Sequence, residues 1–287
     1  MFNTQETMKM CMSTLERFMN KIDLHLVSWN RPKMTELVIK TIHRNTKPGN
    51  FRLVVLDNGS EESTQQMLKD LHDNGYIDEV FLLEKNIGLE AARQWMLEEA
   101  THGEYFVCID NDCLPSWRDG EKDWLERLVD LMSQYEDLAA LSCRTQVMVG
   151  TGNIFEEADK TGEDLVEFPH PGGSFRIMQT RAVKLVGGWD RGAEGRGQEE
   201  RYIGGKLNEA GYRTAFAPKI RCLHLFGTRG DNPTDRWGYD KDLKPEDTGH
   251  SDVSHPALTN GDDYEELLLY SGDELAKEYF YDNSSDS

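Results

Sequence analysis

Two aspartates separated by one residue are the part of this sequence best suited to chemistry. The apolar run Phe106-Val107-Cys108-Ile109 ends abruptly in Asp110-Asn111-Asp112. Alternate residues of an extended chain point the same way, so both carboxylates are expected to project from the carboxyl end of a strand. A Mg²⁺ or Mn²⁺ ion held by one or two carboxylates keeps positions open for phosphate oxygens. The triplet therefore predicts a site for a divalent cation and a diphosphate, although Asp-x-Asp also occurs in ordinary turns, where Asp and Asn accept backbone hydrogen bonds.

Three further polar clusters follow apolar runs in the same way. They are Ser28-Trp29-Asn30, Asp57-Asn58-Gly59-Ser60 and Asn86-Ile87-Gly88. Each one alone is consistent with turn chemistry, in which Gly and Asn supply positive φ and Ser or Asp caps a helix. Ligands of open α/β sheets, however, bind outside the carboxyl ends of the strands. We therefore expect all four clusters to converge on one site.

The elements that must position these clusters form a regular alternation. Apolar segments at residues 23–29, 51–56, 79–83 and 105–109 predict strands, and periodic segments at 33–44, 62–73, 89–99 and 123–135 predict the helices that follow them. Four strand-then-helix units in succession predict a mostly parallel sheet with helices on both faces.

The second half of the chain has a less regular pattern. Strands are predicted at residues 138–149, 176–179, 212–217 and 219–226, and helices at 181–186 and 198–210. The Gly-rich stretch 150–173 is predicted to be a mobile loop. No internal repeat is apparent in the sequence.

The overall composition predicts a soluble, cytoplasmic protein. The length of 287 residues suits one large α/β domain with an appendage. The sequence has no apolar run of about 18 residues that would span a membrane, and residues 1–20 lack the apolar core of a secretory signal. The five cysteines are odd in number and never in Cys-x-x-Cys spacing, which argues against a disulfide framework or a structural zinc site.

The net charge of −20 is concentrated at the carboxyl terminus. Residues 228–287 contain 16 Asp and Glu against 5 Lys and Arg, which is more than half of the excess. A strongly acidic chain repels a phosphate backbone over long range, so nonspecific binding to nucleic acid is not expected.

The motifs occur in an order and spacing that resemble glycosyltransferase family 2, whose members have the GT-A fold. The segments that carry this resemblance are Val27-Ser28-Trp29-Asn30-Arg31-Pro32, Leu56-Asp57-Asn58-Gly59-Ser60, Asn86-Ile87-Gly88-Leu89-Glu90-Ala91-Ala92-Arg93, Asp110-Asn111-Asp112, Gly187-Gly188-Trp189-Asp190, Glu199-Glu200 and His224. The resemblance implies a Rossmann-like, mostly parallel central sheet flanked by helices. It also implies transfer of a hexose or related sugar from a nucleoside diphosphate donor, with Mn²⁺ or Mg²⁺ and with inversion at the anomeric carbon.

The resemblance also implies a division of the chain. A catalytic domain at 23–227 would consist of a nucleotide-binding half (23–113) and an acceptor half (114–227). An N-terminal segment (1–22) precedes it, and an acidic C-terminal extension (228–287) without a counterpart in the family follows it.

Site residues follow from the resemblance position by position. The donor nucleotide would contact Ser28, Asn30, Asp57, Asn86, Gly88, Arg93, Asp110 and Asn111; the acceptor would contact Gly188, Trp189 and Asp190; and Asp110, Asp112 and His224 would hold the metal. Within the first set, Asp57 is expected at the nucleobase, and Arg93 at the base or the diphosphate. Glu200 occupies the catalytic-base position, and Glu199 the preceding position, which commonly binds the acceptor.

Departures from the family pattern and simpler explanations leave several of these roles open. Glu-Glu stands where Glu-Asp is commoner, so the identity of the base is not fixed, and carboxylates at a helix start are also favoured by the helix dipole alone. His224 is equally consistent with a hydrogen-bonded core histidine. Trp189 suits either the core or a platform for a sugar ring. Arg93 also suits a solvated helix face.

Three functions are compatible with the sequence. The leading hypothesis is a metal-dependent, inverting glycosyltransferase with a uridine nucleotide as the preferred donor. A nucleotidyltransferase would use the same Asp-Asn-Asp triplet but release pyrophosphate. A noncatalytic module that binds a nucleotide sugar or a protein partner is the third. The acceptor hydroxyl is open between a glycan, a protein side chain, a small molecule and a hydroxylated nucleobase.

Overall fold

The first half of the chain alternates strand and helix as predicted. The computed structural model describes residues 21–116, 121–145, 154–172, 175–190 and 199–224. Its first elements are β1 (Ile22–Ser28), α2 (Pro32–Asn45), β2 (Phe51–Asp57), α3 (Glu62–Asp73), β3 (Glu79–Leu82), α4 (Leu89–Glu99) and β4 (Tyr105–Asp110). β1 pairs in parallel with both β2 and β4, and β2 pairs in parallel with β3. The carboxyl ends of these four strands therefore lie along one edge.

The second half adds strands of both directions to the same sheet. Its elements are β5 (Cys113–Pro115), α5 (Trp124–Gln134), β6 (Leu138–Thr145), α6 (Ile154–Thr161), β7 (Val166–Glu167), β8 (Phe175–Gln179), α7 (Thr180–Leu185), α8 (Glu199–Glu209) and β9 (Arg213–His224). The strand order is β3-β2-β1-β4-β8-β6-β9-β5, with β7 beside β9. β8 is antiparallel to β4 and β6, and β9 is parallel to β6 but antiparallel to β5 and β7. The sheet is thus parallel in its first half and mixed in its second.

Three expectations for the second half need correction. Residues 154–161 form helix α6 and residues 166–167 form β7, where a mobile loop was predicted, because Phe155 and Ala158 give α6 a buried face. The strands predicted at 212–217 and 219–226 are one strand, β9, in its described part. The register against β6 shifts between Cys143 and Arg144, where three residues of β9 beginning with Pro218 are left over. This irregularity accommodates Pro218, since proline cannot donate to the ladder. The short strand β5 was not predicted.

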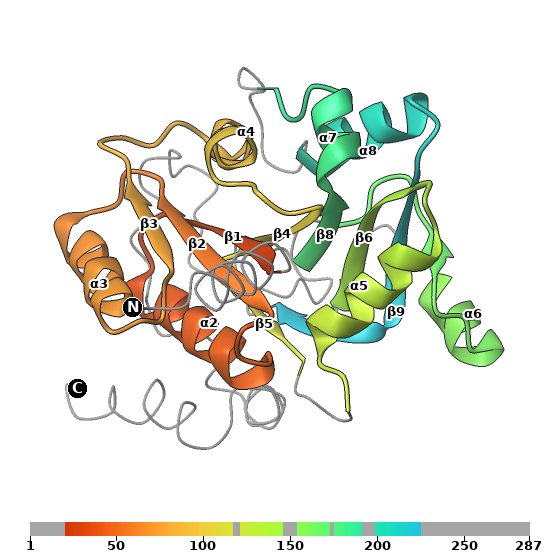
Figure 1. The fold of residues 1–287 in the computed structure, drawn as a ribbon, viewed down its shortest axis with the longest axis horizontal. Helices are drawn as coiled ribbons and strands as arrows, with labels where there is room; N and C mark the ends of the chain where they lie inside the picture. The colour runs from red at the N-terminus through yellow and green to blue at the C-terminus, as the bar shows by residue number, and fades with distance from the viewer. Residues whose placement is uncertain (1–20, 117–120, 146–153, 173–174, 191–198, 225–287) are drawn as a thin grey trace, which may run out of the picture.

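Helices cover both faces of the sheet (Figure 1). On one face, α2, α3 and α5 pack on a large core that includes Leu24, Leu37, Leu68, Trp124 and Ile177. On the other face, α4, α7 and α8 pack on Phe106, Met178 and neighbouring residues. Helix α4 packs through Ala92 and Met96 on Val54 and Leu56 of β2 on this second face. Its amino terminus follows the loop after β3, at the edge where the parallel strands end.

Two predictions from composition can be compared with the described residues. Cys108, Cys113, Cys143 and Cys222 are buried thiols that take part in no disulfide, as predicted. No helix in the described segments has the length and apolar character needed to cross a membrane. Cys11, the predicted N-terminal segment up to residue 20 and the predicted C-terminal extension lie outside the described residues.

Candidate active site

The four polar strand-end clusters meet at one edge of the sheet, as predicted. The backbone N–H of Asn58 donates to the carbonyl of Ser28 at 2.7 Å, which joins the ends of β1 and β2. Asn58 Nδ2 donates to Asn86 Oδ1 at 3.0 Å, which joins β2 to the loop after β3. Asn111 Nδ2 donates to Thr35 Oγ1 at 3.1 Å, and Thr35 Oγ1 lies 3.4 Å from Ser28 Oγ. The hydrogen bonds thus link all four clusters.

Asp57 is fully buried and its carboxylate is used within the protein. It accepts hydrogen bonds from Ser60 N at 2.9 Å, from Ser60 Oγ, and from Gln65 Nε2 at 3.0 Å. These bonds close the turn in which Gly59 has φ +76°, and a Cβ on Gly59 would lie 2.2 Å from the backbone carbon of Lys85. Asp57 therefore shapes the turn that brings two strand-end loops together. Direct contact with a nucleobase, as the resemblance implies, would require one of its oxygens to become accessible.

Asn30 and Arg31 both adopt the left-handed conformation between β1 and α2, with φ of 52° and 57°. Each such non-glycine residue costs on the order of 1–3 kcal/mol, and such outliers concentrate at functional sites. Asn30 is held by its N–H to Ser60 Oγ at 2.7 Å and by Glu61 N to its Oδ1 at 3.0 Å. Arg31 Nη1 lies 3.3 Å from Asp112 Oδ2. The strained turn therefore places a guanidinium beside the Asp-Asn-Asp triplet.

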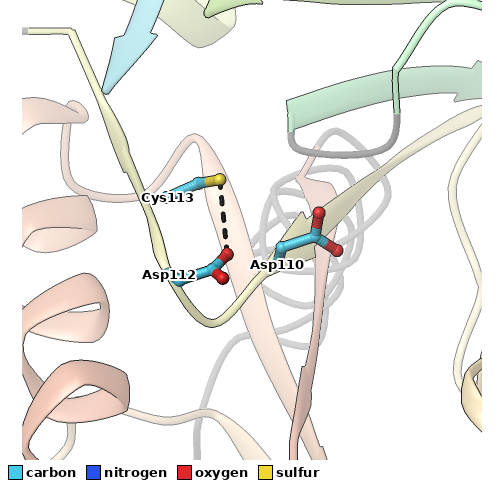
Figure 2. Close-up of side chains that lie close together, drawn as sticks. All are labelled: Asp110, Asp112 and Cys113. Carbon is cyan, nitrogen blue, oxygen red and sulfur yellow. Dashed lines mark hydrogen bonds between the residues drawn. The ribbon is translucent and has the colours of Figure 1, made fainter. Parts of the chain in front are cut away.

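Asp110 and Asp112 lie close enough to share a cation (Figure 2). Oxygens of both carboxylates and the Sγ of Cys113 all lie within 4.8 Å of one another, and Cys113 Sγ donates to Asp112 Oδ1 at 3.6 Å. Two carboxylates are suitable ligands for Mn²⁺ or Mg²⁺, whereas the thiol favours softer ions. The donor set therefore fits the cation that the sequence predicts. The backbone of His224 pairs with Cys113 in the β5–β9 register, but the His224 side chain lies outside the described part of the structure.

Arg93 bridges Asp110 and Glu199. Its Nη2 donates to Asp110 Oδ1 at 2.7 Å, and its Nε lies 3.4 Å from Glu199 Oε1. The side chain is only 4% exposed, so it does not lie on a solvated helix face. Burial alone would lower the pKa of Arg93, but the Glu199 and Asp110 carboxylates outweigh burial and raise it. Arg93 is thus a permanently charged link between β4 and α8.

Glu199 is buried between two guanidiniums. Its Oε1 accepts hydrogen bonds from Arg176 Nη2 and from Trp189 Nε1, the latter at 2.7 Å, and its side chain is 2% exposed. Burial would raise the pKa of Glu199, but Arg176 and Arg93 outweigh it and hold the pKa below the ordinary glutamate value. A carboxylate in this position has almost no surface for an acceptor. Its contacts instead fix the start of α8.

The Gly-Gly-Trp-Asp segment docks against α4. Trp189 N donates to Gln94 Oε1 at 2.7 Å, and a Cβ on Gly188 would lie 2.1 Å from that same oxygen. The Trp189 ring is buried and lies edge-on to Phe106, with centroids 6.3 Å apart. Of the two alternatives for Trp189, the structure therefore supports the core residue, because a buried ring offers no face to a sugar. Asp190 is exposed at the end of the segment.

The remaining expected residues lie at the surface of the same edge. Glu200 is partly exposed on the first turn of α8 and forms no hydrogen bond or ion pair with the described residues. Asn86 and Gly88 are exposed beside the start of α4, and Asn86 Oδ1 accepts Gly88 N at 2.8 Å. Of the two glutamates, Glu200 is the one with a carboxylate available to a substrate.

Three residues of this network were missed by the sequence reasoning. Arg31 was assigned only to the helix start, Gln94 was not assigned, and Arg176 was placed in a short strand without a role. Arg176 did carry a signal, because an arginine in the apolar segment Phe175-Arg176-Ile177-Met178 needs a buried counterion. Arg31 and Gln94 carried no comparable signal, since their partners come from distant parts of the chain.

Comparisons with known proteins agree with this fold. The model of glycosyl transferase family 2 matches residues 24–188, more than half of the chain. None of the curated proteins matches the chain. The mannosyltransferase PcManGT from Pyrobaculum calidifontis, solved with GDP-Man and Mn²⁺, is similar with a TM-score of 0.58 and 16% identity over 93% of this chain and 76% of that chain.

A second similar structure is GalNAc-T7 with UDP, GalNAc and Mn²⁺. Its TM-score is 0.58 at 17% identity, and the match covers 93% of this chain and 58% of that chain. This chain therefore spans little more than half the length of GalNAc-T7. At such identities both structures establish the shared GT-A fold and nothing finer. The extent of the family match does settle membership: the chain belongs to glycosyl transferase family 2 and is a glycosyltransferase.

Proposed function

We propose that this glycosyltransferase moves a sugar from a nucleoside diphosphate donor to an acceptor hydroxyl, with a divalent cation and with inversion at the anomeric carbon. The observation that carries the proposal is the Arg93 bridge. Its Nη2 binds Asp110 of the proposed cation site at 2.7 Å, and its Nε approaches Glu199, the neighbour of Glu200, at 3.4 Å. A donor diphosphate at the aspartates and a base at Glu200 would thus be held on one rigid frame.

The cation site would be formed by Asp110 and Asp112, with His224 as a further proposed ligand. When bound, Mn²⁺ or Mg²⁺ would stabilise the negative charge that develops on the departing diphosphate. The Mn²⁺ and the nucleotides in the two similar structures support this assignment. Arg31, 3.3 Å from Asp112, is positioned to donate to the same diphosphate oxygens through its planar guanidinium.

Glu200 is the proposed general base. It would accept the proton of the acceptor hydroxyl as that oxygen attacks the anomeric carbon from the face opposite the diphosphate. Its partial exposure and lack of a partner among the described residues suit this role. Glu199 is less suitable because two guanidiniums already bind its carboxylate and lower its pKa. We therefore assign Glu199 a positioning role, and the acceptor side to Asp190, because Gly188 and Trp189 are buried.

The experiment is a panel of nucleotide sugars with Mn²⁺, read by thermal shift and by release of nucleoside diphosphate. Both uridine and guanosine donors belong in the panel, since the preference for uridine depends on Asp57, which is buried here. Candidate acceptors are glycans, peptides, small hydroxylated molecules and hydroxylated nucleobases. The anomeric configuration of the product, read by NMR, tests inversion.

Two variants separate the proposed roles. Glu200→Gln is expected to lower kcat by about 10²- to 10⁴-fold while the donor still binds, because only proton transfer is lost. Asp112→Ala is expected to lose cation-dependent donor binding as well. Glu209→Gln, exposed at the far end of α8, is the matched control and should retain full activity.

Other outcomes would overturn the proposal. Full activity in Glu200→Gln would remove the assigned base. Release of pyrophosphate instead of a nucleoside diphosphate would indicate nucleotidyl transfer. Donor binding without any turnover above the Asp112→Ala background, over the whole acceptor panel, would favour a noncatalytic binding module.

A further inference from the structure

Glu90 is a buried carboxylate that the mechanism above does not use. It lies in the first turn of α4, at the edge where the parallel strands end, and the residue is 8% exposed. Residues three and four apart share a helix face, so Glu90 lies on the same face as Arg93 and Gln94. Arg93 contacts Glu199, and Gln94 contacts Trp189 N. Glu90 therefore lies on the face of α4 that meets the start of α8.

Among the described residues, Glu90 has few hydrogen-bond donors or positive charges near its carboxylate. Within the described residues, Glu90 forms no ion pair and no hydrogen bond to another residue, and the hydrogen bond that lowers its pKa comes from its own backbone N–H. Burial raises the pKa of Glu90, and the nearby carboxylates of Glu199 and Glu200 raise it further, while Arg93 opposes them. A glutamate in a first helical turn is favoured by the helix dipole, but an exposed one would serve that purpose as well. The position of this largely buried glutamate is therefore not explained by contacts with other residues.

We propose that the Glu90 carboxylate accepts hydrogen bonds from hydroxyl groups of the sugar that is being transferred, and so contributes to the choice of sugar. The inference rests on the proposed function. A largely buried carboxylate without donors from other residues needs water or a ligand to supply them, and a ligand that enters the site displaces that water. Sugar hydroxyls are such donors, and they carry no charge that a cluster of carboxylates would repel.

The position of Glu90 favours the sugar over the other parts of the donor. The diphosphate is anionic, so it belongs beside the cation site and Arg31 and away from an unpaired carboxylate. The acceptor hydroxyl belongs at Glu200. The sugar must lie between the diphosphate and that hydroxyl. Glu90 lies one helical turn before Arg93, which connects Asp110 to Glu199, the neighbour of Glu200.

The test compares the affinity of a nucleoside diphosphate with that of its sugar conjugates. The probes are UDP, GDP, UDP-glucose, UDP-N-acetylglucosamine and GDP-mannose with Mn²⁺, titrated calorimetrically into the full chain. Glu90→Gln keeps the shape of the side chain and removes the charge. The nucleotide sugar with the highest affinity for the wild type is expected to bind this variant about 10-fold more weakly, which is the usual effect of losing a hydrogen bond to a charged group. The affinity for the parent nucleotide should not change. The differences in affinity between the nucleotide sugars should also become smaller in this variant.

Glu99→Gln, exposed near the carboxyl end of the same helix, is the matched control and should match the wild type. Equal affinity of wild type and Glu90→Gln for every nucleotide sugar would overturn the inference. Equal weakening of the nucleotide and its sugar conjugate would overturn it too, because Glu90 would then act on the fold or the nucleotide. Failure of the wild type to bind any probe would instead refute the proposed function, so the two failures are distinguishable.

Discussion

Arg93 Nε lies 3.4 Å from Glu199 Oε1, and Nη2 of the same guanidinium donates to Asp110 Oδ1 at 2.7 Å. Asp110 ends β4 and Glu199 begins α8, so one planar group connects the proposed cation site to the residue that precedes the proposed base. The cluster of Arg93, Arg176, Glu199 and Asp110 contains two cations and two anions. Its charges therefore balance, which a buried ionic network requires.

Arg93→Lys tests whether the planar shape of the Arg93 guanidinium matters in addition to its positive charge. Lysine keeps the positive charge but cannot hold Asp110 and Glu199 at once, because it lacks the planar fork. We expect kcat to fall by roughly 10²-fold, since small misplacements of reacting groups have effects of that size, with little change in the KM for the acceptor. Steady-state kinetics measure both parameters.

Arg213→Lys is the matched control for that variant, because Arg213 also binds two carboxylates, those of Glu167 and Asp137, but at the exposed edge of β9. It should keep wild-type kinetics. A normal kcat in Arg93→Lys would show that charge alone suffices and that the bridge does not position Glu200.

The sequence predicted the parallel half of the sheet because each strand there is followed by local turn signals. Asp57-Asn58-Gly59-Ser60 and Asp110-Asn111-Asp112 mark strand ends through residue types that act within a few positions. β9 was read as two strands because Pro218 is a local breaker, whereas pairing with β6 holds the strand together across the irregularity. Long-range pairing of this kind leaves no mark in the local sequence.

The candidate site was predictable to the same extent. The residues that cluster at the strand ends were identified, because their types and positions are local properties. The contacts among them were not, because Arg93 meets Glu199 only when α4 and α8 pack on the same face of the sheet. Trp189 shows the limit most clearly: its indole N–H binds Glu199 in the interior, where the sequence alone left a sugar platform equally open.

Gly188→Ala is expected to destabilise the fold by disturbing the contact between α4 and the Gly-Gly-Trp-Asp segment. Gly188 has φ +64°, and a Cβ there would lie 2.1 Å from Gln94 Oε1 and 2.8 Å from Leu97 Cδ2. The left-handed conformation costs alanine about 1–2 kcal/mol, and relief of the clash costs about 1–3 kcal/mol more. Urea unfolding measures the sum.

Gly187→Ala separates the two contributions. Gly187 also has positive φ, +81°, but the nearest atom to its added Cβ is Lys206 Nζ at 3.7 Å, an ordinary contact. Only the conformational cost should appear in this variant. Equal loss of stability in the two variants would show that Gln94 and Leu97 yield freely, so that the close approach of Gly188 is not important for the fold.

Because His25 is buried, we expect the folded protein to lose stability in mild acid. His25 lies buried in β1, stacked on Phe106 with centroids 5.2 Å apart. Burial lowers its pKa from 6.5 to about 4, opposed by Asp23 and assisted by Arg52 and Arg93. The folded state therefore holds His25 neutral, while the unfolded state takes up a proton once the pH falls below about 6.5.

The sign of the effect follows from this difference. Because the unfolded state binds the extra proton, the free energy of unfolding should fall as the pH drops from about 6.5 towards about 4, by on the order of 3 kcal/mol in total. In His25→Gln, which cannot titrate, this part of the pH dependence should be absent, whereas the exposed His72→Gln should keep it. Urea unfolding of the three proteins over that range measures the difference. Parallel curves of unfolding free energy against pH for wild type and His25→Gln would mean that His25 becomes protonated inside the fold. Two observations argue against that: the ring stacks on Phe106, and Nε2 has no hydrogen-bond partner among the described residues.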